Sequence, residues 1–289
     1  MDHFCGGMFC LLVAMTFMTA GEMPLVIKNG GKWKSALAGC FAAAVVQSSS
    51  AVSCAVCAAR RDEGLSDAAA RALLIGANVG TTLTPFLTAL GAGLSDRMML
   101  LFPLVGMLSL ILRSKLPKPF EILPVFCLLM WGLALMGTAA PELVSRLPQG
   151  AAERLFSSPV AAFCGGAALT ALLQSSSVCI GLIQMASLSL PLSRAAVLPM
   201  LIGQNVGTAS TALIATVGAG RQAKACARYH LCFNLRGAAW ALPLCLCLRP
   251  LLSDPAGPFF MAAAHFAFNF VNALIHLLFF KEKAASESY

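Results

Sequence analysis

Long apolar runs cover most of the sequence, and they constrain the fold more than any other feature. Only 11% of the 289 residues are charged and 58% are hydrophobic, whereas soluble domains have about 25% charged residues. Several runs reach the roughly 20 residues that a helix needs to cross a bilayer. Since backbone groups in lipid must be paired within helices or closed barrels, we predict an all-helical polytopic membrane protein. The runs are 4–20, 36–59, 72–95, 98–112, 122–140, 159–190, 195–218, 226–248 and 257–280.

The net charge and the cysteines are consistent with this class and add no other function. A formal charge of +8 does not indicate nucleic-acid binding here, because no basic stripe alternates with aromatic residues. Most of the twelve cysteines lie inside apolar runs, where cysteine packs as a small apolar residue. Cys54 and Cys57 have CxxC spacing, but one such pair alone is weak support for a metal or disulfide site. We therefore predict packing roles and no metal site.

Two polar motifs each occur twice at a constant spacing of 127 positions. QSSS occupies 47–50 and again 174–177, and GANVGTT at 76–82 matches GQNVGTA at 203–209. Two motifs held in register over more than forty positions indicate an internal repeat. We predict a first repeat at 1–119, and a second repeat at 120–289 that includes two additional C-terminal helices.

The loop charges predict how these repeats lie in the membrane. If the QSSS segments, at about 36–59 and 159–190, are re-entrant helical hairpins, fourteen of the twenty Lys and Arg fall on one face and five on the other. The face with more Lys and Arg is then the cytoplasmic one. This arrangement has about seven crossings and two hairpins, with the N-terminus outside and the C-terminus in the cytoplasm. The repeats are then inverted, as in many secondary transporters of the plasma membrane.

The polar motifs are the candidate binding site, because buried polar groups are costly unless they find partners. Helix N-termini at a hairpin tip favour an anion, and carbonyl and hydroxyl oxygens suit a cation. We also expect the GxNVGT helix to be broken, unwinding between its glycines to expose backbone oxygens. The candidate residues are Gln47, Ser48, Ser49, Ser50, Asn78, Gly80, Thr81, Thr82, Gln174, Ser175, Ser176, Ser177, Asn205, Gly207, Thr208 and Ser210. A serine enzyme is not indicated, since no GxSxG motif is present.

These motifs, together with HLCFN at 230–234 and HFAFN at 265–269, resemble the type II sodium/phosphate cotransporters, bacterial branch. The resemblance covers nearly the whole chain. It implies coupling of sodium to the movement of inorganic phosphate, a site lined by QSSS, and no cofactor besides sodium as the coupling ion. Many bacterial relatives carry a PhoU-like helical domain, which we do not expect in this sequence.

Three further residues lie within the apolar runs. Arg236 is expected at mid-helix, where it either attracts phosphate, pairs with a carbonyl or extends to the interface. His230 and His265 are expected to cap helices or pack between them. The apolar runs contain no Asp or Glu, which favours sodium over protons as the coupling ion. The sequence leaves two alternative functions open: a transporter of another oxyanion or a neutral solute, and a membrane interaction or sensor protein that transports nothing.

Overall fold

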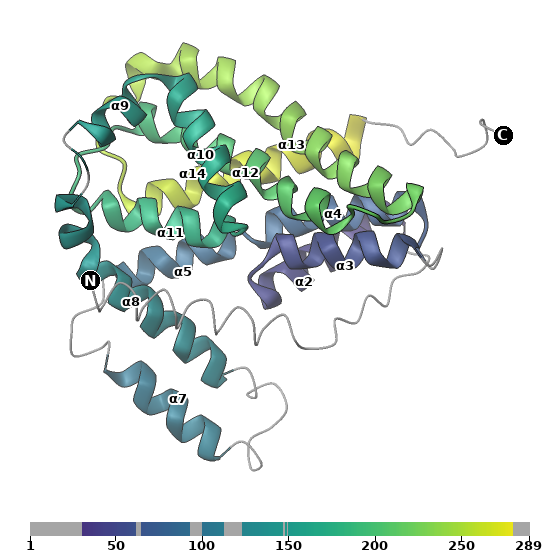
Figure 1. The fold of residues 1–289 in the computed structure, drawn as a ribbon, viewed down its shortest axis with the longest axis horizontal. Helices are drawn as coiled ribbons and strands as arrows, with labels where there is room; N and C mark the ends of the chain where they lie inside the picture. Colours follow the sequence, from purple (N-terminus) through teal and green to yellow (C-terminus); the bar gives the residue numbers. More distant parts are fainter. Residues whose placement is uncertain are drawn as a thin grey trace.

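The protein is all-helical, as the sequence predicts (Figure 1). The computed structural model describes residues 31–61, 65–92, 100–112, 123–146, 148 and 150–279, and these contain no strand. Its helices are α2 (Lys32–Val46), α3 (Ser49–Arg61), α4 (Asp67–Gly80), α5 (Leu83–Ala92), α7 (Leu101–Ile111), α8 (Leu123–Ser145), α9 (Ala151–Ser157), α10 (Pro159–Leu173), α11 (Ser176–Ala186), α12 (Arg194–Ala215), α13 (Arg221–Leu248) and α14 (Pro258–Phe279), with a 3-10 turn at Arg249–Leu251. The predicted apolar run 4–20 lies outside the described residues.

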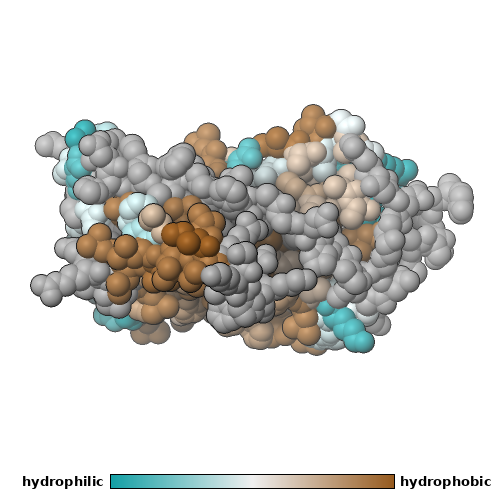
Figure 2. All heavy atoms as spheres, turned by 90° about the horizontal axis from the view of Figure 1, so that it is seen from below, coloured by the Kyte–Doolittle hydropathy of each residue, from teal (hydrophilic) through white to brown (hydrophobic). Residues whose placement is uncertain are grey.

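Four helical stretches of the described residues are long and apolar enough to cross a membrane. They are Asp67–Gly91, Arg194–Ala215, Arg221–Leu251 and Pro258–Phe279. In the view of Figure 2, apolar side chains form a broad patch left of centre and further patches along the upper and lower edges, and most hydrophilic residues lie toward the two ends of the long axis. This distribution is the one expected of a protein whose outer surface contacts lipid.

The two copies of the repeat fold into the same local elements. In the first copy, α2 and α3 flank the QSSS segment and α4 follows; in the second, α10, α11 and α12 repeat this order. Even the helix caps recur: the Ser66 hydroxyl accepts from the Ala69 N–H, and the Ser193 hydroxyl from the Ala196 N–H, each at 3.2 Å. A serine oxygen at this position satisfies one of the unpaired N–H groups of the first turn.

Glycines allow the first helix of each copy to contact the third at backbone distance. A Cβ at Gly76 of α4 would lie 1.8 Å from the carbonyl oxygen of Ala36, and one at Gly203 of α12 would lie 2.0 Å from that of Phe163. Only glycine permits this approach, as in many membrane helix pairs. The unwinding predicted between Gly76 and Gly80 is therefore wrong: α4 is helical across this segment, and its glycines pack against α2.

The helix break expected at the GxNVGT motif occurs in one copy only, at the end of the motif. In the first copy α4 ends at Gly80, Thr81 and Thr82 form a turn, and α5 begins at Leu83. The cause is Pro85, because a proline cannot donate an N–H and its ring clashes with the carbonyl four residues earlier. In the second copy Ala212 stands at the matching position and α12 continues to Ala215. The predicted break in the second copy is wrong.

The last two helices lie against both copies of the repeat. Contacts between Phe233 and His276 and between Trp240 and Phe268 show that α13 and α14 run antiparallel. Apolar clusters join this pair to α4 through residues such as Ile75 and to α12 through residues such as Ile202. At the edge of the molecule, α7 lies along α8 (Figure 1).

Candidate functional site

Each QSSS segment lies where two helices meet end to end. Gln47 and Gln174 end the preceding helices, α2 and α10, and both adopt the left-handed backbone conformation, with φ of 56° and 52°. The next residues start α3 and α11, and the hydroxyls of Ser48 and Ser175 accept hydrogen bonds from the N–H groups three residues on, at 3.2 and 3.3 Å. We call residues 47–50 the first tip and residues 174–177 the second tip.

The two tips touch one another in the interior of the protein. The Ser177 hydroxyl of the second tip donates to the backbone oxygen of Gln47 at 3.2 Å. It also contacts the Thr84 hydroxyl at 3.3 Å, and Thr84 in turn donates to Oε1 of Gln47 at 2.7 Å. All three residues are buried, with 1 to 4% of their surface exposed. Segments 130 positions apart in the sequence thus share one polar cluster.

The sequence did not point to Thr84, although a signal for it exists. Thr84 and Thr211 are 127 positions apart, which extends the register of the repeat beyond the GxNVGT motif. Thr84 is the second residue of α5, directly before Pro85. This position brings its hydroxyl to the Gln47 amide.

The surroundings of the two tips differ. Gln47 is 4% exposed, whereas Gln174 is an exposed residue. The hydroxyls of Ser210 and Thr211 on α12 are buried without a hydrogen-bond partner among the described residues. In the second copy, the structure therefore does not repeat the contacts that Thr84 makes in the first, and it leaves two hydroxyls on α12 without a partner.

The asparagines of the GxNVGT motifs use their amide nitrogens within their own helices. Nδ2 of Asn78 donates to the Leu74 oxygen, and Nδ2 of Asn205 donates to the Leu201 oxygen, each at 2.9 Å. The Asn78 amide also lies 3.0 Å from Nε2 of His230 on α13. The structure gives neither asparagine a hydrogen bond to a tip, so their predicted role in binding stays a prediction.

Other predicted site residues of the two GxNVGT motifs also make contacts within the helical frame. The hydroxyls of Thr81 and Thr208 donate to the carbonyls four residues earlier, at 3.0 and 2.9 Å, and Thr82 donates to the carbonyl of Val79 at 2.6 Å. Gly80 and Gly207 lie against α2 and α10, with carbonyl oxygens 2.0 and 2.4 Å from the position of a Cβ. Each hydroxyl keeps acceptor capacity after donating.

The H-x-x-FN segments pack inside the helix bundle, as predicted for their histidines. His230 and His265 are buried, and Nδ2 of Asn234 and of Asn269 donates to the backbone oxygen of the histidine in the same segment, at 3.2 and 2.9 Å. His230 contacts Asn78 of the first repeat. These segments therefore tie the last two helices into the core.

Arg236 is not brought together with the tips. It lies on the exposed side of α13, while the buried side of this helix carries Phe233 and Gly237. These two neighbours contact His276 and Asn272, which belong to the last two turns of α14. Arg236 lies at the middle of α13 (Arg221–Leu248), which confirms the mid-helix position that the sequence predicts.

Comparison with known proteins agrees with the duplicated motifs. A family model described as Na+/Pi-cotransporter matches residues 4–138 and again residues 128–247. The chain belongs to this cotransporter family. Membership indicates a transporter rather than an enzyme, as the sequence predicts.

One curated relative of this family member comes from Bacillus subtilis (strain 168), where it is called uncharacterized protein YqeW. The two are 36% identical over 118 residues, which is 39% of this chain and 37% of the relative. The match therefore spans little more than a third of either protein. No solved structure matches the chain.

Proposed function

We propose that the protein is a secondary transporter that couples sodium ions to the movement of inorganic phosphate across the plasma membrane. The observation that carries this proposal is the contact between the two tips, in which Ser177 donates to Gln47. Two polar helix breaks meeting inside an apolar protein are the arrangement from which secondary transporters build a central site. Family membership supports sodium and phosphate as the transported species.

The proposal includes inverted repeats with re-entrant tips, and the positions of the ionic groups support it. Residues that the re-entrant topology places on the cytoplasmic side lie together: Arg60 and Arg71 both pair with Asp67, and Arg71 stacks on Tyr229 in the third turn of α13. Lys32 donates to the backbone oxygen of Leu277 near the end of α14. The re-entrant topology places both Lys32 and the C-terminal end of α14 on the cytoplasmic side.

The opposite face has its own cluster of charges. Arg194, which the re-entrant topology places outside because it follows the second hairpin, pairs with Asp254 at 3.0 Å. Ser193 and Arg249 line one pocket, so the start of α12 and the end of α13 lie close together. The segregation of these charges to separate clusters supports the predicted topology, with the cytoplasmic side at the richer cluster.

The tips offer a suitable chemistry for both ions. The N-termini of α3 and α11 begin at the tips, and unpaired N–H groups with the positive end of a helix dipole favour an oxyanion. Serine hydroxyls can donate to the same anion. The amide oxygen of a glutamine and the last carbonyls of α2 and α10 are neutral oxygen ligands of the kind that a hard cation accepts. In this proposal sodium offsets the charge of phosphate, which binds between the tips.

The difference between the tips supports an alternating-access cycle. The first tip is bonded to Thr84 through the buried Gln47, whereas Gln174 is exposed and the Thr211 hydroxyl has no hydrogen-bond partner among the described residues. In an inverted repeat, the two halves exchange these environments as the site opens to one side and then to the other. We propose that the second tip, where Gln174 is exposed, receives the ions in this state.

Uptake of radiolabelled phosphate into proteoliposomes tests the proposal. We expect uptake that requires an inward sodium gradient and that is abolished in the double variant Gln47→Ala, Gln174→Ala. A choline gradient of equal concentration controls for ionic strength. Gly220→Ala is the matched control variant, because a Cβ at Gly220 meets no atom within 4 Å.

The outcomes separate the alternatives. Competition by sulfate rather than by arsenate, with little phosphate uptake, would assign a different oxyanion to the same site. Sodium-dependent uptake at the normal rate in the folded double variant would remove the tips from the binding site. Absence of any ion-coupled flux from folded protein would favour a membrane interaction protein.

A further inference from the structure

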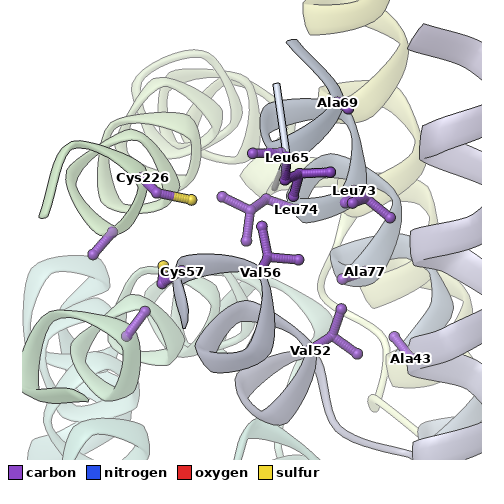
Figure 3. Close-up of a cluster of buried hydrophobic side chains, with 13 residues drawn as sticks. Ala43, Val52, Val56, Cys57, Leu65, Ala69, Leu73, Leu74, Ala77 and Cys226 are labelled. Atoms are coloured by element: carbon purple, nitrogen blue, oxygen red, sulfur yellow. The ribbon is translucent and has the colours of Figure 1, made fainter. Parts of the chain in front are cut away.

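Two cysteines that the proposed function does not use lie face to face between the first hairpin and α13. Cys57 is near the end of α3 and Cys226 is in the second turn of α13. Their thiols are hydrogen-bond partners, and Figure 3 shows both side chains in the space between the two helices. Both are free thiols, 1% and 3% exposed. The pair joins segments that are far apart in the sequence.

We propose that Cys57 and Cys226 are a redox modification site, whose oxidation to a disulfide ties the first hairpin to α13 and arrests transport. The inference that a bond forms does not depend on the transported substrate. The arrest of transport rests on the function proposed above.

The position of the pair makes such a bond consequential. Cys57 lies on the helix that starts at the first tip, about two turns after Ser50 along α3. Cys226 lies one turn before His230, which contacts Asn78 of the first repeat. While both thiols are reduced, the first hairpin can move relative to α13. A disulfide holds its two sulfur atoms about 2.05 Å apart and prevents this movement.

The chemistry balances with an external two-electron oxidant. Two S–H bonds break and one S–S bond forms, and the two electrons and two protons leave with the oxidant. Hydrogen peroxide takes them up and becomes two molecules of water; diamide, an azodicarboxamide, takes them up and becomes a hydrazine. Since cytosolic disulfides in ordinary proteins are usually transient and redox-sensing, a pair near the basic end of the bundle, one turn from Arg60 and Lys224, suits such a switch.

The neighbouring Cys54 provides a matched control. It lies one turn before Cys57 on the same helix and is half-buried rather than buried. It does not belong to the buried apolar cluster that contains both Cys57 and Cys226. A reaction that depended only on reactive thiols would involve Cys54 at least as readily as Cys57.

Mass spectrometry of the oxidised protein detects the bond without any transport assay. Purified full-length protein in proteoliposomes is treated with diamide, its remaining thiols are blocked, and it is digested with trypsin after denaturation. Cys226 falls in the peptide 225–228 and Cys57 in the peptide 35–60. We expect these two peptides to be linked in the wild type and in Cys54→Ser, and not in Cys57→Ser or Cys226→Ser. Absence of the link in wild type, or its persistence in Cys57→Ser, would overturn the proposal.

Phosphate uptake by the same vesicles tests the arrest. We expect diamide to lower uptake about tenfold in wild type and Cys54→Ser, because closure steps gate many transport and catalytic cycles. A thiol reductant should restore it, and Cys226→Ser should keep its rate throughout. Unchanged uptake with the link formed would overturn the switch. A lack of uptake in the reduced protein would instead overturn the proposed function, while the peptide result would still decide whether the bond forms.

Discussion

The first and second tips share one sequence and one backbone conformation, yet they have different surroundings. Gln47 and Gln174 both adopt the left-handed backbone conformation, and the hydroxyls of Ser48 and Ser175 cap the helix that follows. The first tip is nevertheless buried against Thr84, and the second is exposed at Gln174. Local sequence therefore decides the shape of a tip. Its accessibility depends on the residues that follow the GxNVGT motif.

The largest difference between the copies should follow from their unequal helix breaks. We expect Ala212→Pro to lower the free energy of unfolding by about 3 kcal/mol or more, because it removes an internal hydrogen bond of α12 and introduces a ring clash. Pro85→Ala should change it by much less, because Pro85 lies in the first turn of α5, where N–H groups have no partner within the helix. Thermal and chemical unfolding in detergent measure the free energy of unfolding of both variants. Equal losses of stability in Ala212→Pro and Pro85→Ala would show that the helix break does not distinguish the two copies.

The close glycine contacts should be equally sensitive in the two copies. Gly76→Ala and Gly203→Ala should each cost about 1–3 kcal/mol through overpacking, because the added Cβ would lie within about 2 Å of a backbone oxygen in both. Size-exclusion yield and unfolding temperature report the loss, with Gly220→Ala as a control for the added methyl group alone, because a Cβ there meets no atom within 4 Å. A tolerated Gly203→Ala would mean that the two helix pairs are not equivalent.

The threonines that follow the motif should separate the copies. Thr84→Val leaves Oε1 of Gln47 buried without its donor, which we expect to cost about 1–3 kcal/mol. Thr211→Val should be close to neutral for stability, because the Thr211 hydroxyl has no partner in the described residues. Unfolding of the two variants in parallel gives the comparison. A larger loss for Thr211→Val would contradict the unequal environments described above.

The smallest difference between the copies should come from the matched helix caps. We expect Ser66→Ala and Ser193→Ala to lower the free energy of unfolding by about 1 kcal/mol each, since each hydroxyl accepts one N–H at 3.2 Å. The two values should agree with each other more closely than those of the threonine pair. Differential scanning calorimetry or denaturant titration is sensitive enough to compare them.

The sequence by itself determined the class of the protein, its helices and the position of both tips. Few charges and long apolar runs require helices in lipid, and a repeated polar motif within such runs locates the breaks at Gln47 and Gln174. These are local properties: a helix cap, a left-handed residue and a run of apolar side chains depend on neighbours along the chain. The family followed from the same motifs.

The tertiary structure decided which of these residues meet. That Ser177 reaches Gln47, that Thr84 completes the cluster and that Arg236 faces outward depend on the packing of helices far apart in the sequence. The glycines show the limit most clearly, since Gly76 was expected to loosen a helix and instead lies against the Ala36 backbone. A glycine is compatible with both outcomes, and only the neighbouring helix selects between them, because the gain from close backbone contact arises only when both helices are in place.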